Sequence, residues 1–178
     1  EYTQPDFSGI NKEILAKWEE ENLFAESLRQ RTDAPSFIFY EGPPSANGMP
    51  GIHHVIARSL KDIFCRYKTM KGYRVDRRAG WDTHGLPVEL GVEKLLGITK
   101  DSIGKTISVA EYNATCRREV MKYTAEWEQL TKKMGYWVDM DHPYITYKNK
   151  YIETLWWLLA DLHKKGFLYK GYTIQPYS

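Results

Sequence analysis

Cysteine is scarce in this sequence, because only Cys65 and Cys116 occur among its 178 residues. Their spacing fits neither a zinc site nor a disulfide framework, so the scarcity excludes a small domain held together by disulfides or zinc. We expect both cysteines to be buried thiols, and we expect no structural metal in this segment.

Long apolar runs and a strong charge of either sign are also missing. No run approaches the roughly 20 apolar residues that a membrane-spanning helix needs, and the first residues, EYTQPDFSG, do not resemble a signal peptide. Lysine and arginine total 25 against 23 aspartates and glutamates, and the net charge of +2 does not by itself indicate a nucleic-acid partner. We therefore expect a cytoplasmic globular protein with no membrane partner.

The two ends of the sequence indicate an excised fragment. The chain starts at Glu1 without an initiator methionine. It stops at Ser178, directly after FLYKGYTIQPYS, a segment that is typical of a β-strand. Because a sheet normally continues after such a strand, we expect the parent protein to be longer.

The first half of the chain predicts a strand, loop, helix and strand in succession. Helical spacing begins at Ile10 and ends near 22–24, and a buried strand follows at 37–40. Apolar residues from Ile52 to Met70 then recur on one face of a helix that Gly72 ends, before a second strand at 73–78 and the loop AGWDTHGLP. This order predicts an α/β fold with a right-handed pair of parallel strands and with loops gathered at their carboxyl ends.

The second half reads as largely helical. Ser108 and Glu111 match a capping box, and we expect one long helix from there to about Met134. Another helix is predicted at about 150–165, with its apolar side chains buried and with Trp156 and Trp157 packed in the core.

The loop between the first strand and its helix carries the most chemistry. It reads GPPSANGMPGIHH, residues 42–54, so glycines and prolines precede two histidines at a helix start. Glycines allow a ligand to approach the backbone, and the free N–H groups of a helix start favour phosphate. His53 and His54 are able to donate hydrogen bonds to phosphate oxygens or to charge that develops in a transition state. The motif matches neither GxxxxGK[ST] nor GxGxxG, so a nucleotide site and a plain connection remain equally open on chemistry alone.

Several segments together resemble the class I aminoacyl-tRNA synthetases, and within them most closely the isoleucyl enzymes. They are GPPSANG, GIHH, KDIFCRYKTMKGY and AGWDTHGLPVE, followed less densely by MGYWVDMDHPY, YIETLWWLL and KGFLYKGYTIQPYS. The wording GWDTHGLPVE favours isoleucine over leucine, valine and methionine. The chain departs from the family pattern His-x-Gly-His, because Gly51, Ile52, His53 and His54 occupy those four positions. We expect His53 to reach the phosphate from its shifted position, with Gly51 making room.

The resemblance implies a Rossmann-like (HUP-type) domain that activates isoleucine with Mg-ATP and transfers it to tRNA(Ile). It implies a helical segment at 1–35 and the first half of the catalytic domain at 36–178, truncated before an editing insert. The family's second ATP signature, KMSKS, is not found in the sequence, so we expect the chain alone to be inactive. We expect a monomer with ATP and Mg²⁺ as substrate and no tightly bound cofactor. A synthetase for leucine or valine, a non-catalytic truncated binding module and an unrelated nucleotidyltransferase remain alternatives.

The resemblance also assigns roles to single residues. His54, followed by His53, is the predicted catalytic donor. The predicted ATP-binding residues are Asn47, Gly48, Gly51, His53 and His54, and the predicted amino-acid-binding residues are Gly42, Pro43 and Asp82. Three further candidates carry two interpretations each: Glu41 binds substrate or pairs with a local base, His84 orients its loop or touches substrate, and Trp81 belongs to the core or to the pocket wall. For Asp82 the alternative is a loop cap that accepts backbone N–H bonds.

Overall fold

A parallel three-stranded sheet lies at the centre of residues 4–176, the part of the chain that the computed structural model describes. The strand order is β1-β2-β3, and both pairings are parallel. The elements are, in chain order, α1 (Phe7–Glu20), α2 (Leu23–Arg29), β1 (Ser36–Tyr40), α3 (Ile52–Met70), β2 (Arg74–Trp81), α4 (Leu86–Leu96), the short 3-10 helix η1 (Lys100–Ser102), α5 (Val109–Glu119), α6 (Thr124–Lys133), β3 (Asp139–Ile145) and α7 (Asn149–Lys164). This arrangement confirms the predicted α/β fold with parallel strands.

The unit β1-α3-β2 is formed as the sequence predicts. Phe37 pairs with Val75 and Tyr40 with Arg78, so β1 and β2 run parallel with α3 as the connection between them. Gly72 has a φ of +88°, a conformation that side chains other than glycine rarely adopt, and it allows the chain to turn back after α3.

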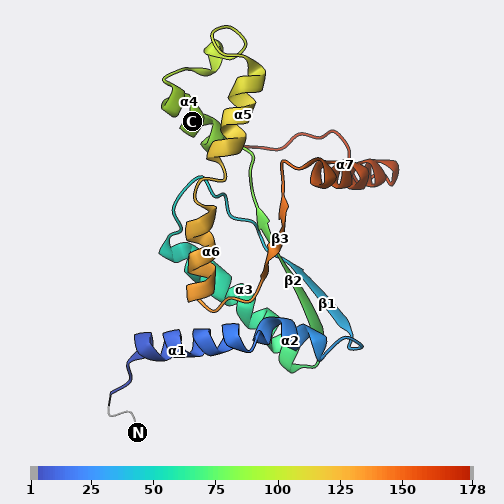
Figure 1. Cartoon of the computed structure of the whole chain (residues 1–178). Helices are drawn as coiled ribbons and strands as arrows, with labels where there is room; N and C mark the ends of the chain where they lie inside the picture. Colours follow the sequence, from blue (N-terminus) through green and yellow to red (C-terminus); the bar gives the residue numbers. More distant parts are fainter. Residues whose placement is uncertain (1–3, 177–178) are drawn as a thin grey trace.

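All three strands end at the same edge of the sheet. Their last residues are Tyr40, Trp81 and Ile145. In Figure 1, α4 and α5 lie beyond this edge, whereas α1 and α2 lie at the opposite end of the strands. The loops that follow β1 and β2 therefore meet at the carboxyl edge, which is where parallel α/β sheets bind ligands.

The part of the core next to the glycine-rich loop lies between the sheet and α6. Ala46, Trp81 and Trp127 form one buried cluster, and Ala79, Tyr136 and Val138 form a second cluster. Because Ala46 belongs to the glycine-rich loop, the core supports the loop directly.

The prediction of one long helix over 108–134 is wrong, because the structure has two helices, α5 and α6, in this range. Ser108 caps α5 as expected, since its hydroxyl oxygen accepts a hydrogen bond from the N–H of Glu111 at 3.1 Å. The helix is interrupted before Thr124, where the N–H of Tyr123 donates to the carbonyl of Ala46 at 3.0 Å. This tertiary bond replaces the helical one, and it overrides the local helix preference.

Helix α7 has nearly the predicted bounds, but its predicted burial is wrong. None of its described side chains is buried, and Trp156 and Trp157 are 68% and 67% exposed. Figure 1 shows α7 projecting beyond the sheet, so within residues 4–176 most of its length has no layer to pack against. The strand predicted after it is also wrong for residues 167–176, which form neither helix nor strand, and residues 177–178 lie outside the described part.

Burial also differs from expectation elsewhere. The apolar face of α3 is exposed, with Phe64 at 67%, whereas Arg58 and Cys65 on the same helix are buried. Of the two cysteines only Cys65 is fully buried, and Cys116 is half-buried. Burial raises the pKa of both thiols. Within residues 4–176 no helix is long and apolar enough to cross a membrane.

Candidate functional site

The glycine-rich loop lies beside Asp82 at the carboxyl edge of the sheet. The N–H of Asp82 donates to the carbonyl of Pro44 at 2.9 Å, and Ser45 forms a parallel bridge with Asp82. The loop after β1 and the loop after β2 are therefore held together by backbone contacts. The structure brings Gly42 and Pro43 into the same corner as Asp82.

Most of the hydrogen-bonding capacity of the Asp82 carboxylate is unused within the described part of the chain. The side chain is half-buried, and its Oδ1 accepts one long hydrogen bond, 3.4 Å, from the N–H of His84. A loop cap normally accepts at about 2.9 to 3.0 Å, so capping uses only a small part of the acceptor capacity of this side chain. The remaining capacity suits a substrate ammonium group, which stays a prediction.

The start of the loop is anchored by Glu41, whose side chain is 1% exposed. Its carboxylate accepts hydrogen bonds from the ammonium of Lys61 on α3 and from the hydroxyl of Tyr136. Of the two interpretations of Glu41, the structure therefore shows the pairing with a local base. Burial and the bond to Glu41 raise the pKa of Tyr136, so this hydroxyl stays protonated and acts as a donor.

The backbone of Glu41 is also hydrogen-bonded. Its N–H donates to the carbonyl of Arg78 at 2.8 Å, and its carbonyl accepts from the hydroxyl of Tyr144. Lys61 also donates to the carbonyl of Gly42 at 3.3 Å. These bonds fix the direction in which the chain leaves β1 and enters the predicted substrate loop.

His54 lies in the first turn of α3 with one ring nitrogen already occupied. Its Nδ1 accepts a hydrogen bond from the N–H of Gly51 at 2.9 Å. Burial lowers the pKa of His54, and the neighbouring charges of His53 and Arg58 lower it further. The ring is therefore neutral at pH 7, and its proton is on Nε2, which is left as a hydrogen-bond donor.

His53 occupies the space that a side chain at position 51 would need. A Cβ atom placed on Gly51 would lie 2.9 Å from Cε1 of His53, which is too close for an ordinary contact. The two histidine rings lie side by side, with their centroids 3.8 Å apart. Glycine at position 51 thus makes the placement of the His53 ring possible, and the exposed ring is accessible to a ligand.

The far end of the loop is held by α6, which the sequence did not point to. Asn47 accepts a hydrogen bond from the hydroxyl of Ser45 at 2.9 Å, and the carbonyl of Gly48 accepts one from Nε1 of Trp127 at 2.9 Å. Lys61 and Trp127 are the residues at this site that sequence reasoning missed. No local signal marks either of them, because only the tertiary fold brings them to the loop.

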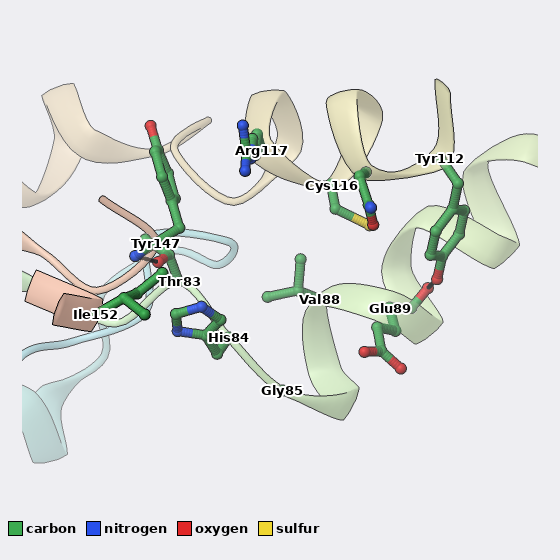
Figure 2. Close-up of a pocket in the computed structure, with 11 residues that line it drawn as sticks. Thr83, His84, Gly85, Val88, Glu89, Tyr112, Cys116, Arg117, Tyr147 and Ile152 are labelled. Atoms are coloured by element: carbon green, nitrogen blue, oxygen red, sulfur yellow. Dashed lines mark hydrogen bonds between the residues drawn. The ribbon is translucent and has the colours of Figure 1, made fainter. Parts of the chain in front are cut away.

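His84 lines a cavity of about 250 Å³ between α4, α5 and the start of α7. Its Nδ1 lies 2.9 Å from the hydroxyl of Thr146, which is also bonded to Thr83. Figure 2 shows the His84 ring facing the cavity, with Tyr147 on one side and Val88 on the other. The bond to Thr146, directly after β3, supports the interpretation that His84 orients its loop, and contact with substrate stays a prediction.

Trp81 is 3% exposed and belongs to the core cluster with Ala46 and Trp127. Its burial supports the core interpretation. In the described part of the chain, no group of three or more histidine, cysteine, aspartate or glutamate side chains is arranged to hold a metal ion.

Residues 13–178 match the family described as tRNA synthetases class I (I, L, M and V). The match covers most of the chain, and the chain therefore belongs to this family of class I aminoacyl-tRNA synthetases.

Among its curated relatives, the isoleucine--tRNA ligases of Bacteroides fragilis and Porphyromonas gingivalis are each 76% identical over all 178 residues. The isoleucine--tRNA ligase 2 of Bacillus cereus is 50% identical over 169 residues, or 95% of the chain. The chain spans about 16% of the length of each of these relatives.

A solved structure shares the fold. It is described as the ternary complex of Agrobacterium radiobacter K84 agnB2 LeuRS-tRNA-LeuAMS, and it matches with a TM-score of 0.61 and 21% identity. The match covers 92% of this chain and 19% of that one. It supports the Rossmann-like architecture.

Proposed function

We propose that this chain is the front part of the catalytic domain of an enzyme that activates isoleucine with ATP and transfers it to tRNA(Ile). The observation that supports this most directly is the corner in which the loop 42–48, the start of α3 and Asp82 meet at the carboxyl edge of the sheet. The names of the 76% identical relatives support isoleucine as the amino acid.

In the first step, the carboxylate of isoleucine attacks the α-phosphorus of Mg-ATP. A carboxylate oxygen-phosphorus bond forms, the bond to the pyrophosphate oxygen breaks, and pyrophosphate leaves with the electron pair. Asp82 holds the ammonium group of isoleucine, and the isoleucine side chain lies against the backbone of Gly42 and Pro43. Nε2 of His54 donates to a phosphate oxygen, assisted by His53, while Asn47, Gly48 and Gly51 line the ATP. Catalysis then rests on alignment and on hydrogen bonds to developing negative charge.

In the second step, the acyl group passes from the adenylate to a terminal ribose hydroxyl of tRNA(Ile), and AMP leaves. Neither step requires a covalent intermediate on the enzyme. Residues 36–178 form the first half of the catalytic domain in this proposal, and 1–35 precede it as a helical segment. We further propose a monomeric cytoplasmic enzyme without a tightly bound cofactor in this segment.

Isoleucine-dependent exchange of pyrophosphate into ATP tests the proposal in the full-length enzyme. Isoleucine should support exchange with a kcat/KM at least about tenfold above those of leucine and valine, since small differences in a pocket correspond to 1–3 kcal/mol. The range of about 1–3 kcal/mol is a general one for such pockets, and the discrimination of isoleucine from valine by this enzyme class is one of the cases on which it is based. A preference for leucine or valine would instead support the alternative synthetases, and no exchange with any of the three would support the truncated binding module.

The 178-residue chain alone should show no exchange above background. It supplies the donors at the start of α3, but its sequence holds no KMSKS-type signature for the other side of the triphosphate. The measurement compares equimolar chain and full-length enzyme. Measurable isoleucine-dependent exchange by the chain alone would contradict this prediction.

His53→Gly should lower kcat/KM for ATP by about 100-fold in the full-length enzyme, because one positioned donor to a developing oxyanion typically contributes this much. The physical reason is that the His53 ring lies where a side chain at position 51 would lie, and the substitution removes that ring. Lys71→Met, at the far end of α3, serves as the control. Unchanged kinetics of the His53 variant would show that the ring only caps the helix.

A further inference from the structure

Trp127 is the most deeply buried large side chain near the loop, at 1% exposed, and the chemistry proposed above does not use it. It lies on α6, 79 residues after Gly48, yet its indole N–H donates to the Gly48 carbonyl at 2.9 Å. A buried indole needs a hydrogen-bond partner, and this one takes it from the loop rather than from its own helix. The hydrogen bond therefore links α6 to the loop that is proposed to line ATP.

The same indole also contacts His54. The His54 and Trp127 rings meet edge to face, with centroids 4.6 Å apart and planes at 73°. On the other side, Nδ1 of His54 accepts from Gly51 at 2.9 Å. A ring that is held by a hydrogen bond at one nitrogen and by an aromatic contact has little freedom to turn. The direction of Nε2, the free donor, is thereby set.

Trp127 is itself held in place from two directions. The guanidinium of Arg58, a residue only 3% exposed, lies 5.0 Å from the indole centroid. Arg58 also donates to the hydroxyl of Thr131, and this hydroxyl donates to the carbonyl of Trp127 at 2.7 Å. A functional group is positioned well only when the side chains behind it are locked, and these contacts lock Trp127.

Tyr123, next to α6, adds a second attachment to the same loop. Its N–H donates to the carbonyl of Ala46 at 3.0 Å, so positions 46 and 48 are both held from this side. The geometry points to Trp127 as a positioning residue of the ATP site. Its indole fixes the position of the loop backbone at Gly48 and the orientation of the His54 ring. This inference rests on the proposed function, in which the loop and His54 bind ATP.

The full-length enzyme tests this with Trp127→Phe, which keeps an aromatic ring against His54 and Arg58 but has no N–H for Gly48. Loss of a hydrogen bond of this kind corresponds to about a fivefold to tenfold change, which we expect in the KM and in the Kd for ATP. The KM for isoleucine should stay within twofold, because the indole N–H bonds to Gly48, whereas the proposed isoleucine contacts are made by Asp82, Gly42 and Pro43. Trp127→Leu, which also removes the ring, should lower kcat of pyrophosphate exchange by about a further tenfold.

Trp137→Phe is the matched control. Trp137 is another large indole, but it packs against Trp18 and Phe24 and not against the loop. Its variant should leave the KM values for both substrates unchanged. Thermal unfolding of each variant shows whether the fold is kept.

An ATP Kd and KM of Trp127→Phe equal to those of the wild type would overturn the inference. An equal loss for ATP and isoleucine together with a lower unfolding temperature would overturn it as well, since that is the result of a purely structural role. The Kd for ATP, measured by calorimetry without amino acid, decides the matter even if the wild type shows no exchange with isoleucine. In that case the proposed function fails separately.

Discussion

Asp82→Asn should lower kcat/KM for isoleucine in the full-length enzyme by about 10- to 150-fold while the KM for ATP changes little. A hydrogen bond to a charged partner contributes about 1.5–3 kcal/mol, which corresponds to that range. The substitution removes the negative charge and keeps an oxygen at the same place. The measurement is pyrophosphate exchange at varied isoleucine and saturating ATP.

This variant separates the two interpretations of Asp82. Asparagine still accepts the 3.4 Å hydrogen bond from the N–H of His84, so a mere loop cap would be preserved. Asp76→Asn is the control, because Asp76 is also half-buried on β2 but pairs with Arg74 at 3.2 Å. Normal kinetics of the Asp82 variant would therefore assign the residue to the loop and not to the ammonium.

Lys61→Met should destabilise the catalytic domain by about 2 kcal/mol. Removing one partner of a buried ion pair costs about 3–5 kcal/mol when the other charge stays buried. Glu41 is 1% exposed, but Lys61 is 31% exposed, so water screens part of the interaction and the expected loss is smaller. For a domain of 150–250 residues, that loss lowers the melting midpoint by about 4–8 °C.

The substitution of the other partner, Glu41→Gln, should destabilise the domain less than Lys61→Met does. In Glu41→Gln the buried charge is gone, the amide still accepts a hydrogen bond from Tyr136, and Lys61 is free to turn to solvent. We expect about half the loss of stability. Lys71→Met, an exposed lysine after the same helix, should leave the midpoint unchanged. If Glu41→Gln lowers the stability more than Lys61→Met does, the unpaired buried charge of Glu41 is not the main cause of the loss.

The strand, loop and helix that carry the site follow from local signals. The run 37–40 before a Gly-Pro loop, and the apolar spacing from Ile52 that ends at Gly72, each specify one element without help from the rest of the fold. The parallel direction of β1 and β2 then follows from the helix between them. Asp82 and the loop 42–48 could be placed together for the same reason, because consecutive parallel strands end at one edge.

The remaining features depend on distant contacts. The break between α5 and α6 exists because Tyr123 bonds to Ala46, a partner 77 positions earlier. Strand β3 contains aspartates, a histidine and a proline, and it is held by pairing with β2, where Gly80 leaves room for the ring of Tyr144. The prediction that Trp156 is buried is wrong, because it is exposed. Its spacing predicts that it lies on the apolar face of a helix, but this spacing does not indicate which layer covers that face.

A crystal structure of the full-length enzyme with a non-hydrolysable isoleucyl-adenylate analogue tests the central claim most directly. We predict the ammonium of the analogue within hydrogen-bonding distance of the Asp82 carboxylate, its isoleucine side chain against Gly42 and Pro43, and its phosphate-mimicking group near the loop and Nε2 of His54. An analogue bound away from this corner, with Asp82 and His54 both free of contacts to it, would contradict the assignment of the loop 42–54 as the site of activation.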